Sequence, residues 1–150
     1  MRQILKLTFA VLALVAIALM PQAYAQSTEK RIALVIGNSA YPTGPLQTTA
    51  NDAGLIAQTL QAAGFDVVGA RDLDQDTLRR TFRDFLDKAG AAGPDAVVFI
   101  YLSGYGLQLE GENYFVPIDA KLPRDVDIPI EALRISDYMR ELSRNLGDDV

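Results

Sequence analysis

Three short apolar segments, separated by two segments of helical periodicity, constrain the fold of this sequence more than any other feature. The apolar segments are residues 32–36, 65–68 and 96–102, and their length and content predict buried β-strands. The order strand–helix–strand–helix–strand predicts a parallel sheet with right-handed crossovers. Because parallel strands this apolar are normally covered on both faces, we expect an α/β fold, a three-layer sandwich with a mostly parallel sheet.

Both helical segments carry start or stop signals. The first repeats alanine and large apolar residues over positions 53–63 and ends at Gly64, a typical residue after a helix. The second begins at Asp74, a favoured N-cap residue. Its predicted buried stripe consists of Leu78, Phe82, Phe85, Leu86 and Ala89.

The regular alternation ends after Gly106. Residues 107–109 and 114–116 predict a β-hairpin, with its turn at residues 111–113. A proline-rich loop follows, and Ser136 is the expected N-cap of a last helix.

The N-terminus predicts a secretory signal peptide. Arg2 and Lys6 precede an apolar stretch at residues 9–20, and the Ala-x-Ala pattern at residues 23–25 predicts cleavage before Gln26. The apolar stretch is shorter than the roughly 20 residues of a membrane span. We therefore expect membrane contact only during export, and a bacterial periplasmic or secreted protein. The predicted organisation is a signal peptide at 1–25, a short linker at 26–30 and one domain at 31–150.

Composition excludes several classes of function. The net charge is −5 and there is no basic run, so a nucleic acid partner is not expected. Without cysteine or histidine, the chain has no disulfide and no thiolate or imidazole metal ligand. The loop acids Asp119, Asp125 and Asp127 do not have the spacing of a calcium loop, and we interpret them as solvated. The sequence predicts neither a metal nor a cofactor.

The candidate site is the turn formed by Ser103, Gly104, Tyr105 and Gly106, directly after the most hydrophobic predicted strand. The end of a buried strand is where α/β proteins commonly place a functional site. Tyr105 is the one large side chain in the turn. Ser103 has no histidine to activate it as a nucleophile, so we expect its hydroxyl to bond to local backbone.

Several motifs in order resemble the bacterial caspase-like and metacaspase-like peptidases of the caspase–haemoglobinase fold. The resemblance extends from residue 31 to about residue 145. The motifs are residues 31–38, Tyr41, residues 50–53, the Ser-Gly-x-Gly turn at 103–106, residues 111–114 and residues 117–120.

The resemblance implies a catalytic site that this sequence does not complete. In the family, the turn usually reads Ser-Gly-His-Gly, where the histidine is the general base and the last glycine donates an oxyanion N–H. By position, Tyr105 takes the histidine place and Gly106 the oxyanion place. The nucleophilic cysteine follows at the end of the next parallel strand. We expect the domain to be incomplete at its C-terminus, before that strand.

A phenol is a poor substitute for the imidazole. Imidazole titrates near pH 6.5 and a phenol near pH 10, so a neutral tyrosine does not accept a thiol proton at neutral pH. Three hypotheses stay open from the sequence. The chain is a pseudopeptidase that binds a peptide or protein partner without cutting it, a cysteine endopeptidase whose nucleophile lies beyond this chain, or a truncated remnant. Within the first hypothesis, Tyr105 either contacts the partner or only fills the place of the imidazole.

Overall fold

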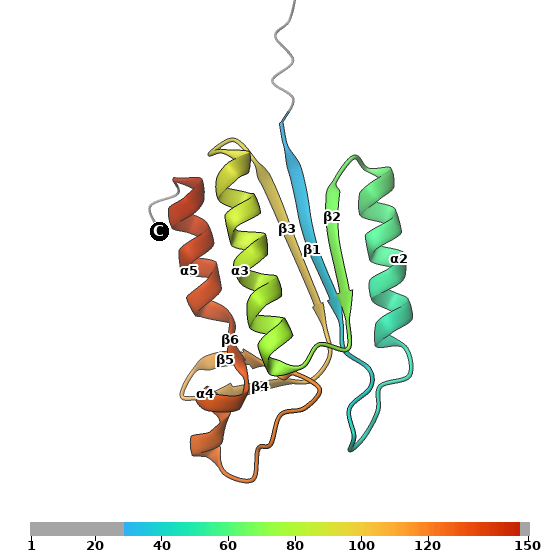
Figure 1. Cartoon of the computed structure of the whole chain (residues 1–150), viewed down its shortest axis with the longest axis vertical. Helices are drawn as coiled ribbons and strands as arrows, with labels where there is room; N and C mark the ends of the chain where they lie inside the picture. Colours follow the sequence, from blue (N-terminus) through green and yellow to red (C-terminus); the bar gives the residue numbers. More distant parts are fainter. Residues whose placement is uncertain (1–28, 148–150) are drawn as a thin grey trace, which may run out of the picture.

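The computed structural model describes residues 29–147, and a three-stranded parallel sheet forms the centre of the domain (Figure 1). The strands are β1 (Arg31–Gly37), β2 (Asp66–Arg71) and β3 (Val97–Ser103). Their order in the sheet is β2-β1-β3, with both pairings parallel. The three predicted strands and their parallel arrangement are confirmed.

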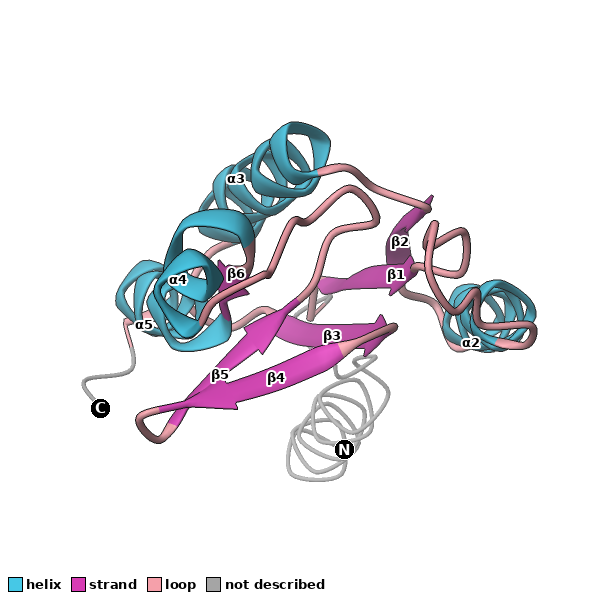
Figure 2. Ribbon diagram, turned by 90° about the horizontal axis from the view of Figure 1, so that it is seen from below, coloured by secondary structure: helices cyan, strands magenta, loops and turns pink. Residues whose placement is uncertain are grey.

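Helices cover both faces of this sheet (Figure 2). Helix α2 (Thr49–Ala62) lies on one face, and α3 (Gln75–Ala92) lies on the other beside α5 (Ile135–Leu146). The predicted three-layer α/β arrangement is therefore confirmed.

The main core lies between the sheet and α3. Alternate residues of β1 point toward α3, and Ile32, Leu34 and Ile36 are all buried there. The five predicted apolar positions of α3 are buried as well.

Two carboxylates cap the N-terminus of α3. Asp74 accepts a hydrogen bond from the Thr77 N–H at 2.7 Å, and Asp119 accepts one from the Gln75 N–H at 2.9 Å.

A small antiparallel sheet follows β3, with the order β4-β5-β6. Its strands are β4 (Gly106–Leu109), β5 (Glu112–Phe115) and β6 (Leu133–Arg134). Between β5 and β6 the chain forms the 3₁₀-helix η1 (Asp125–Asp127) and the short helix α4 (Ile128–Glu131).

The predicted hairpin is confirmed, but its turn lies one residue earlier than expected. Leu109 pairs with Glu112, which leaves Glu110 and Gly111 as a two-residue loop. Both have positive φ, +52° and +82°. This is the type I′ geometry that matches the twist of a hairpin, and it requires φ above zero at both positions.

The predicted cap of the last helix is wrong. Helix α5 begins at Ile135, so Ser136 lies inside its first turn. The Ser136 hydroxyl instead donates a hydrogen bond to the Glu112 carboxylate in β5. The long-range contact to the hairpin replaces the local cap.

The expectation that every strand is covered on both faces fails for β3. Val97 and Phe99 are 38% and 41% exposed on the face that α2 covers elsewhere. Helix α2 approaches the end of β1 closely, where a side chain on Gly37 would lie 2.7 Å from the Ala53 methyl group. The start of β3, at Val97 and Phe99, stays open on this face.

The predicted signal peptide at residues 1–25 lies outside the described residues. Within residues 29–147, no helix combines the length and the apolar character needed to cross a membrane.

Replacing Phe82 with alanine tests the core between β1 and α3. Phe82 is fully buried and its ring lies 4.8 Å from the Tyr138 ring of α5. We expect Phe82→Ala to lower the free energy of unfolding by about 3–5 kcal/mol because of the lost contacts and the cavity left behind. Leu55→Ala, at a position 63% exposed on α2, is the control and should change it by less than about 0.5 kcal/mol. Similar losses in the two variants in urea unfolding would contradict this packing.

Candidate functional site

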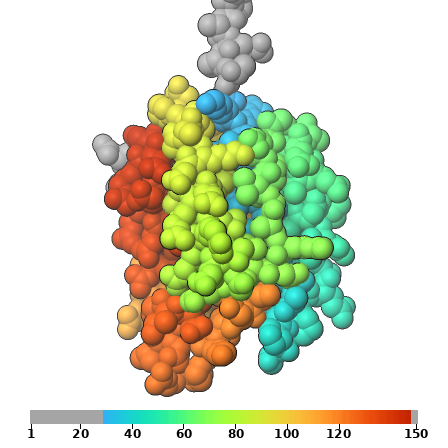
Figure 3. Space-filling view, viewed as in Figure 1, coloured from blue at the N-terminus to red at the C-terminus, as the bar shows by residue number. Residues whose placement is uncertain are grey.

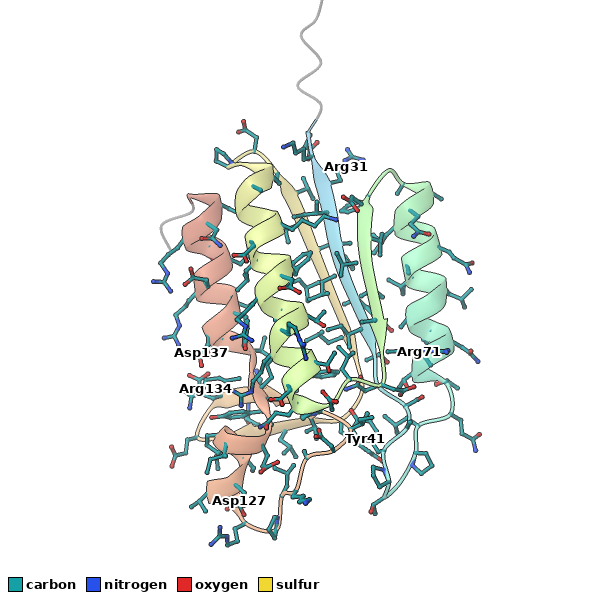
Figure 4. The ribbon with its side chains drawn as sticks, in the orientation of Figure 1. Arg31, Tyr41, Arg71, Asp127, Arg134 and Asp137 are labelled. Atoms are coloured by element: carbon teal, nitrogen blue, oxygen red, sulfur yellow. The ribbon has the colours of Figure 1, made fainter. Side chains whose placement is uncertain are left out.

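The candidate site lies at the carboxyl ends of the parallel strands. The turn of Ser103, Gly104, Tyr105 and Gly106 connects β3 to β4, and the β1–α2 loop reaches the same edge of the sheet (Figure 1). Tyr41, labelled in Figure 4, lies in this region. The segment that follows β5 closes the same end of the molecule below α3 (Figure 3).

A buried amide connects the segments that form this edge. Asn38 follows β1 directly and is fully buried. Its side chain accepts a hydrogen bond from the Leu73 N–H at 2.9 Å and donates one to the Val116 carbonyl at 3.3 Å. Its own N–H donates to the Ser103 carbonyl at 2.8 Å. One residue thus fixes the end of β1 to the end of β3, to the β2–α3 loop and to the segment after β5.

The hydroxyl of Tyr41 makes a second connection. It donates to the Val116 carbonyl at 2.8 Å and accepts from the Tyr105 N–H at 3.0 Å. Burial raises the pKa of the Tyr41 phenol above its usual range. The hydroxyl therefore stays protonated at neutral pH and holds the turn by both hydrogen bonds.

The side chain of Tyr105 is directed toward the β1–α2 loop. Its ring centroid lies 4.7 Å from that of Tyr41, with the planes inclined by 58°. Its hydroxyl donates to the Gly44 carbonyl at 2.8 Å. Although 40% exposed, the residue is held by a stacked ring on one side and a tethered loop on the other.

The two residues before Tyr105 are held through their backbone, Gly104 by close approach and Ser103 by a hydrogen bond. A side chain on Gly104 would lie 2.6 Å from the Tyr41 hydroxyl and 3.0 Å from the Phe115 ring, so only glycine fits without displacement. The Ser103 carbonyl accepts from Asn38. Its hydroxyl makes no hydrogen bond to any residue of the described range, which differs from the local bond that we expected.

The Gly106 N–H points away from the hairpin. Tyr105 and Val116 face each other just beyond the β4–β5 pairs, and the Tyr105 carbonyl accepts a hydrogen bond from the Val116 N–H at 2.9 Å. They are therefore a hydrogen-bonded pair. Hydrogen-bonded and non-bonded pairs alternate along an antiparallel ladder, and the next pair, Gly106 with Phe115, is of the non-bonded kind. The N–H that corresponds to the oxyanion donor is thus directed outward from β5.

An open hollow of about 420 Å³ lies beside this glycine. Residues from the end of β3, the turn, the hairpin and the start of α5 line it, among them Leu102, Gly104, Gly106, Gln108, Phe115 and Ile135. Tyr105 is not among the lining residues. The turn therefore presents its glycine backbone to the hollow and its tyrosine side chain to the β1–α2 loop.

Two of the three acidic residues that we expected to be solvated in the proline-rich loop, Asp119 and Asp127, have structural partners. Asp119 caps α3, as described above. Asp127 pairs with Arg124 at 2.7 Å, and the hydrogen bond from Arg124 holds the pKa of the Asp127 carboxyl below its usual range. Over residues 29–147, no three acidic side chains cluster in a way that could hold a metal ion.

Asp72 is a site residue that sequence reasoning missed. It follows β2 with a positive φ of +51°. One carboxylate oxygen accepts from the Ser39 and Ala40 N–H groups, each at 2.8 Å. These bonds, that from Ser39 foremost, hold the pKa of the Asp72 carboxyl below its usual range. The only sequence signal was an aspartate at a strand end, a residue that tolerates the left-handed conformation.

The sequence profile of the caspase domain family (Peptidase_C14) matches residues 30–146, which covers the parallel sheet, all described helices and the hairpin. The chain belongs to the caspase domain family. No curated protein matches the chain. The family profile confirms the resemblance inferred from the ordered motifs and identifies the Ser-Gly-Tyr-Gly turn as part of a caspase-like peptidase domain.

Removing the Tyr105 hydroxyl should loosen the β1–α2 loop. We expect Tyr105→Phe to keep its ring packed against Tyr41 and to lower the free energy of unfolding by only about 0.5–1 kcal/mol. Amide hydrogen exchange should become faster at Thr43, Gly44 and Leu46. Tyr101→Phe is the matched control, because the Tyr101 hydroxyl bonds to no described residue. Equal exchange in the two variants would show that the tether to Gly44 does not order the loop.

Asp72 should make stability depend on pH in the acid range. A carboxyl whose folded pKa is depressed stabilises the fold above its unfolded pKa of about 3.9, and that stability is lost as pH falls through the folded pKa. We expect Asp72→Asn, which keeps an acceptor oxygen, to be less stable than the parent chain at pH 7. The difference in unfolding free energy should shrink as pH falls below about 4.

Urea unfolding between pH 7 and pH 2 measures this difference. Asp125→Asn is the control, since the exposed Asp125 carboxylate accepts no hydrogen bond from the described residues. A difference for Asp72→Asn that stays constant across the range would contradict the assigned role.

Proposed function

We propose that this caspase-like domain binds peptide or protein segments and does not cleave them. The observation that carries the proposal is the placement of Tyr105. At the position of the general base, a phenol faces away from the hollow and donates its proton to the Gly44 carbonyl at 2.8 Å.

Peptide hydrolysis needs a nucleophile and a base that accepts its proton. The sequence contains no histidine and no cysteine. A neutral phenol engaged as a donor does not accept a thiol or hydroxyl proton at neutral pH. The Gly106 N–H faces away from β5 and makes no ladder hydrogen bond, so it can still bind or polarise a carbonyl. The turn can therefore bind a peptide carbonyl through a backbone N–H, but we propose that it lacks the side chains needed to break the peptide bond.

We further propose that the domain acts after export. This rests on the predicted signal peptide at residues 1–25 and its Ala-x-Ala site before Gln26. Recovery from a bacterial periplasmic extract and sequencing of the N-terminus test this. A mature chain that begins at Gln26 is expected, and one that begins at Met1 would contradict it.

Fluorogenic peptides with arginine, lysine or aspartate before the scissile bond test the absence of cleavage. We expect no release above the buffer rate for the parent chain. Tyr105→His should also show none, because it restores an imidazole without a nucleophile. Turnover by the parent chain that Tyr105→Phe abolishes would overturn the proposal. Turnover gained by Tyr105→His would show that another nucleophile, such as the Ser103 hydroxyl, is in reach.

A further inference from the structure

A second hollow, of about 360 Å³, lies between helix α2 and strand β2. The two elements stand side by side in Figures 1 and 2. Residues of α2 form one wall, β2 forms the other, and the buried Val35 of β1 lies at the base. In the strand order β2-β1-β3, β1 separates this hollow from β3. A strand that extended the sheet beyond β3 would therefore leave the hollow unchanged.

The hollow exists because small residues line it on both sides. Helix α2 contributes only alanines and a glycine, namely Ala50, Ala53, Gly54 and Ala57. Of the 14 residues of the helix, only Ala53 is buried. These short side chains do not fill the space toward β2, and Gly69 adds none from the other wall. The hollow is thus apolar and is left open by the side chains that surround it.

The two glycines of the hollow show that it has room for further atoms. A methyl group added at Gly54 or at Gly69 would meet no atom within 4 Å beyond its neighbours in the chain. At Gly37 and Gly104, by contrast, such a group would approach other atoms to 2.7 Å and 2.6 Å. Close backbone approach therefore does not account for Gly54 and Gly69. The space beside them can take the body of a ligand.

Arg71 carries the one charge among the lining residues. It ends β2, and because strand side chains alternate between faces, it lies on the same face as Gly69. Figure 4 labels it beside the first turns of α2. Within residues 29–147 its guanidinium forms no ion pair, and the carboxylate of the neighbouring Asp72 bonds to the β1–α2 loop instead. Because arginine stays charged at all ordinary pH values, this guanidinium is available to an anion.

The lining selects the chemistry of the ligand. The volume of the hollow lies in the range of small-molecule sites. Its apolar walls favour a hydrocarbon body, since burying apolar surface is favourable. The guanidinium favours a carboxylate, which it can bind through two parallel hydrogen bonds. No other lining side chain forms hydrogen bonds, so a ligand with many polar groups, such as a sugar, would lose its bonds to water without replacement.

We propose that this hollow binds a small monocarboxylate with an apolar body, its carboxylate on the Arg71 guanidinium and its body between α2 and β2. The inference goes beyond the proposed function and does not rest on it. The hollow shares no lining residue with the one beside Gly106. It is a small-molecule site in a domain that we propose to bind peptides at another place.

Hexanoate is the probe for this site, and hexanol is its uncharged counterpart with the same chain length. Each is titrated into the isotope-labelled full chain, and amide chemical shifts are followed by NMR. We expect saturable shifts at Gly54, Gly69 and Ala70 with hexanoate. Hexanol should bind at least about tenfold more weakly, because it cannot form the charged bonds to Arg71. Equal affinities of the two probes would overturn the proposal.

Arg71→Gln tests the charge at the site. Glutamine keeps hydrogen-bond donors but removes the charge, so hexanoate should bind about tenfold more weakly while the affinity for hexanol stays the same. Arg80→Gln makes the same change of charge on α3, on the other face of the sheet, and should alter neither affinity (Figure 2). Equal weakening by both variants would show a general effect of net charge and would overturn the assignment.

Gly54→Leu tests the space in the hollow. Leucine at this position would fill the hollow, and it has a higher helix propensity than glycine. We expect the variant to fold and to lose the saturable binding of hexanoate. Thr59→Leu places the same side chain at an exposed position of α2 outside the hollow and should bind like the parent chain. Should Gly54→Leu fail to fold, the two probes and Arg71→Gln decide the question.

The remaining outcomes distinguish this inference from the proposed function. Shifts confined to residues 104–108 would place hexanoate at the turn and overturn the inference. Titrations of the parent chain without any saturable shift would also overturn it, and would leave peptide binding at the turn untouched. A chain that binds hexanoate as described but binds no peptide would contradict the proposed function alone.

Discussion

The arrangement of the site depends on the buried amide of Asn38. A fully buried polar side chain is costly unless its donors and acceptors are paired. Asn38 meets this condition with bonds to Leu73 and Val116, while its backbone bonds to Ser103 and Thr49. These partners come from four different segments. The segments must meet at the end of β1 for the amide to be satisfied, and their meeting point is the edge of the sheet that carries the candidate site.

Two side chains outside the turn hold the backbone of this site in place. Tyr41 and Asn38 both bond to the Val116 carbonyl, and the Tyr41 hydroxyl also accepts from the turn. None of these bonds involves the side chain of Tyr105. The ring of Tyr105 stacks on Tyr41, and its hydroxyl holds the β1–α2 loop. The side chain of Tyr105 is thus a structural contact between the turn and the β1–α2 loop.

Sequence patterns predicted a helix or strand correctly where the local preference of its residues agrees with the packing in the fold. The stripe of α3 and its Asp74 cap follow from helical spacing and side-chain chemistry, and both are present. The predicted hairpin turn lies one residue earlier, because the twist of the hairpin outweighs local preference. The N-cap of α5 is Arg134, two residues before the predicted Ser136, whose hydroxyl bonds to Glu112 instead. The roles of Asp119 and Asp72 were not predictable, since each bonds to backbone more than thirty positions away.

The sequence by itself determined the family and the parallel α/β fold, and it showed a tyrosine in the Ser-Gly-x-Gly turn. These conclusions depend only on which residues occur, on their order along the chain and on the spacing of the apolar residues. The tertiary structure alone decided where those residues point. It directs the Tyr105 side chain to the β1–α2 loop and the Gly106 N–H away from β5. Such directions follow from strand register and helix placement, which are set by contacts between distant segments.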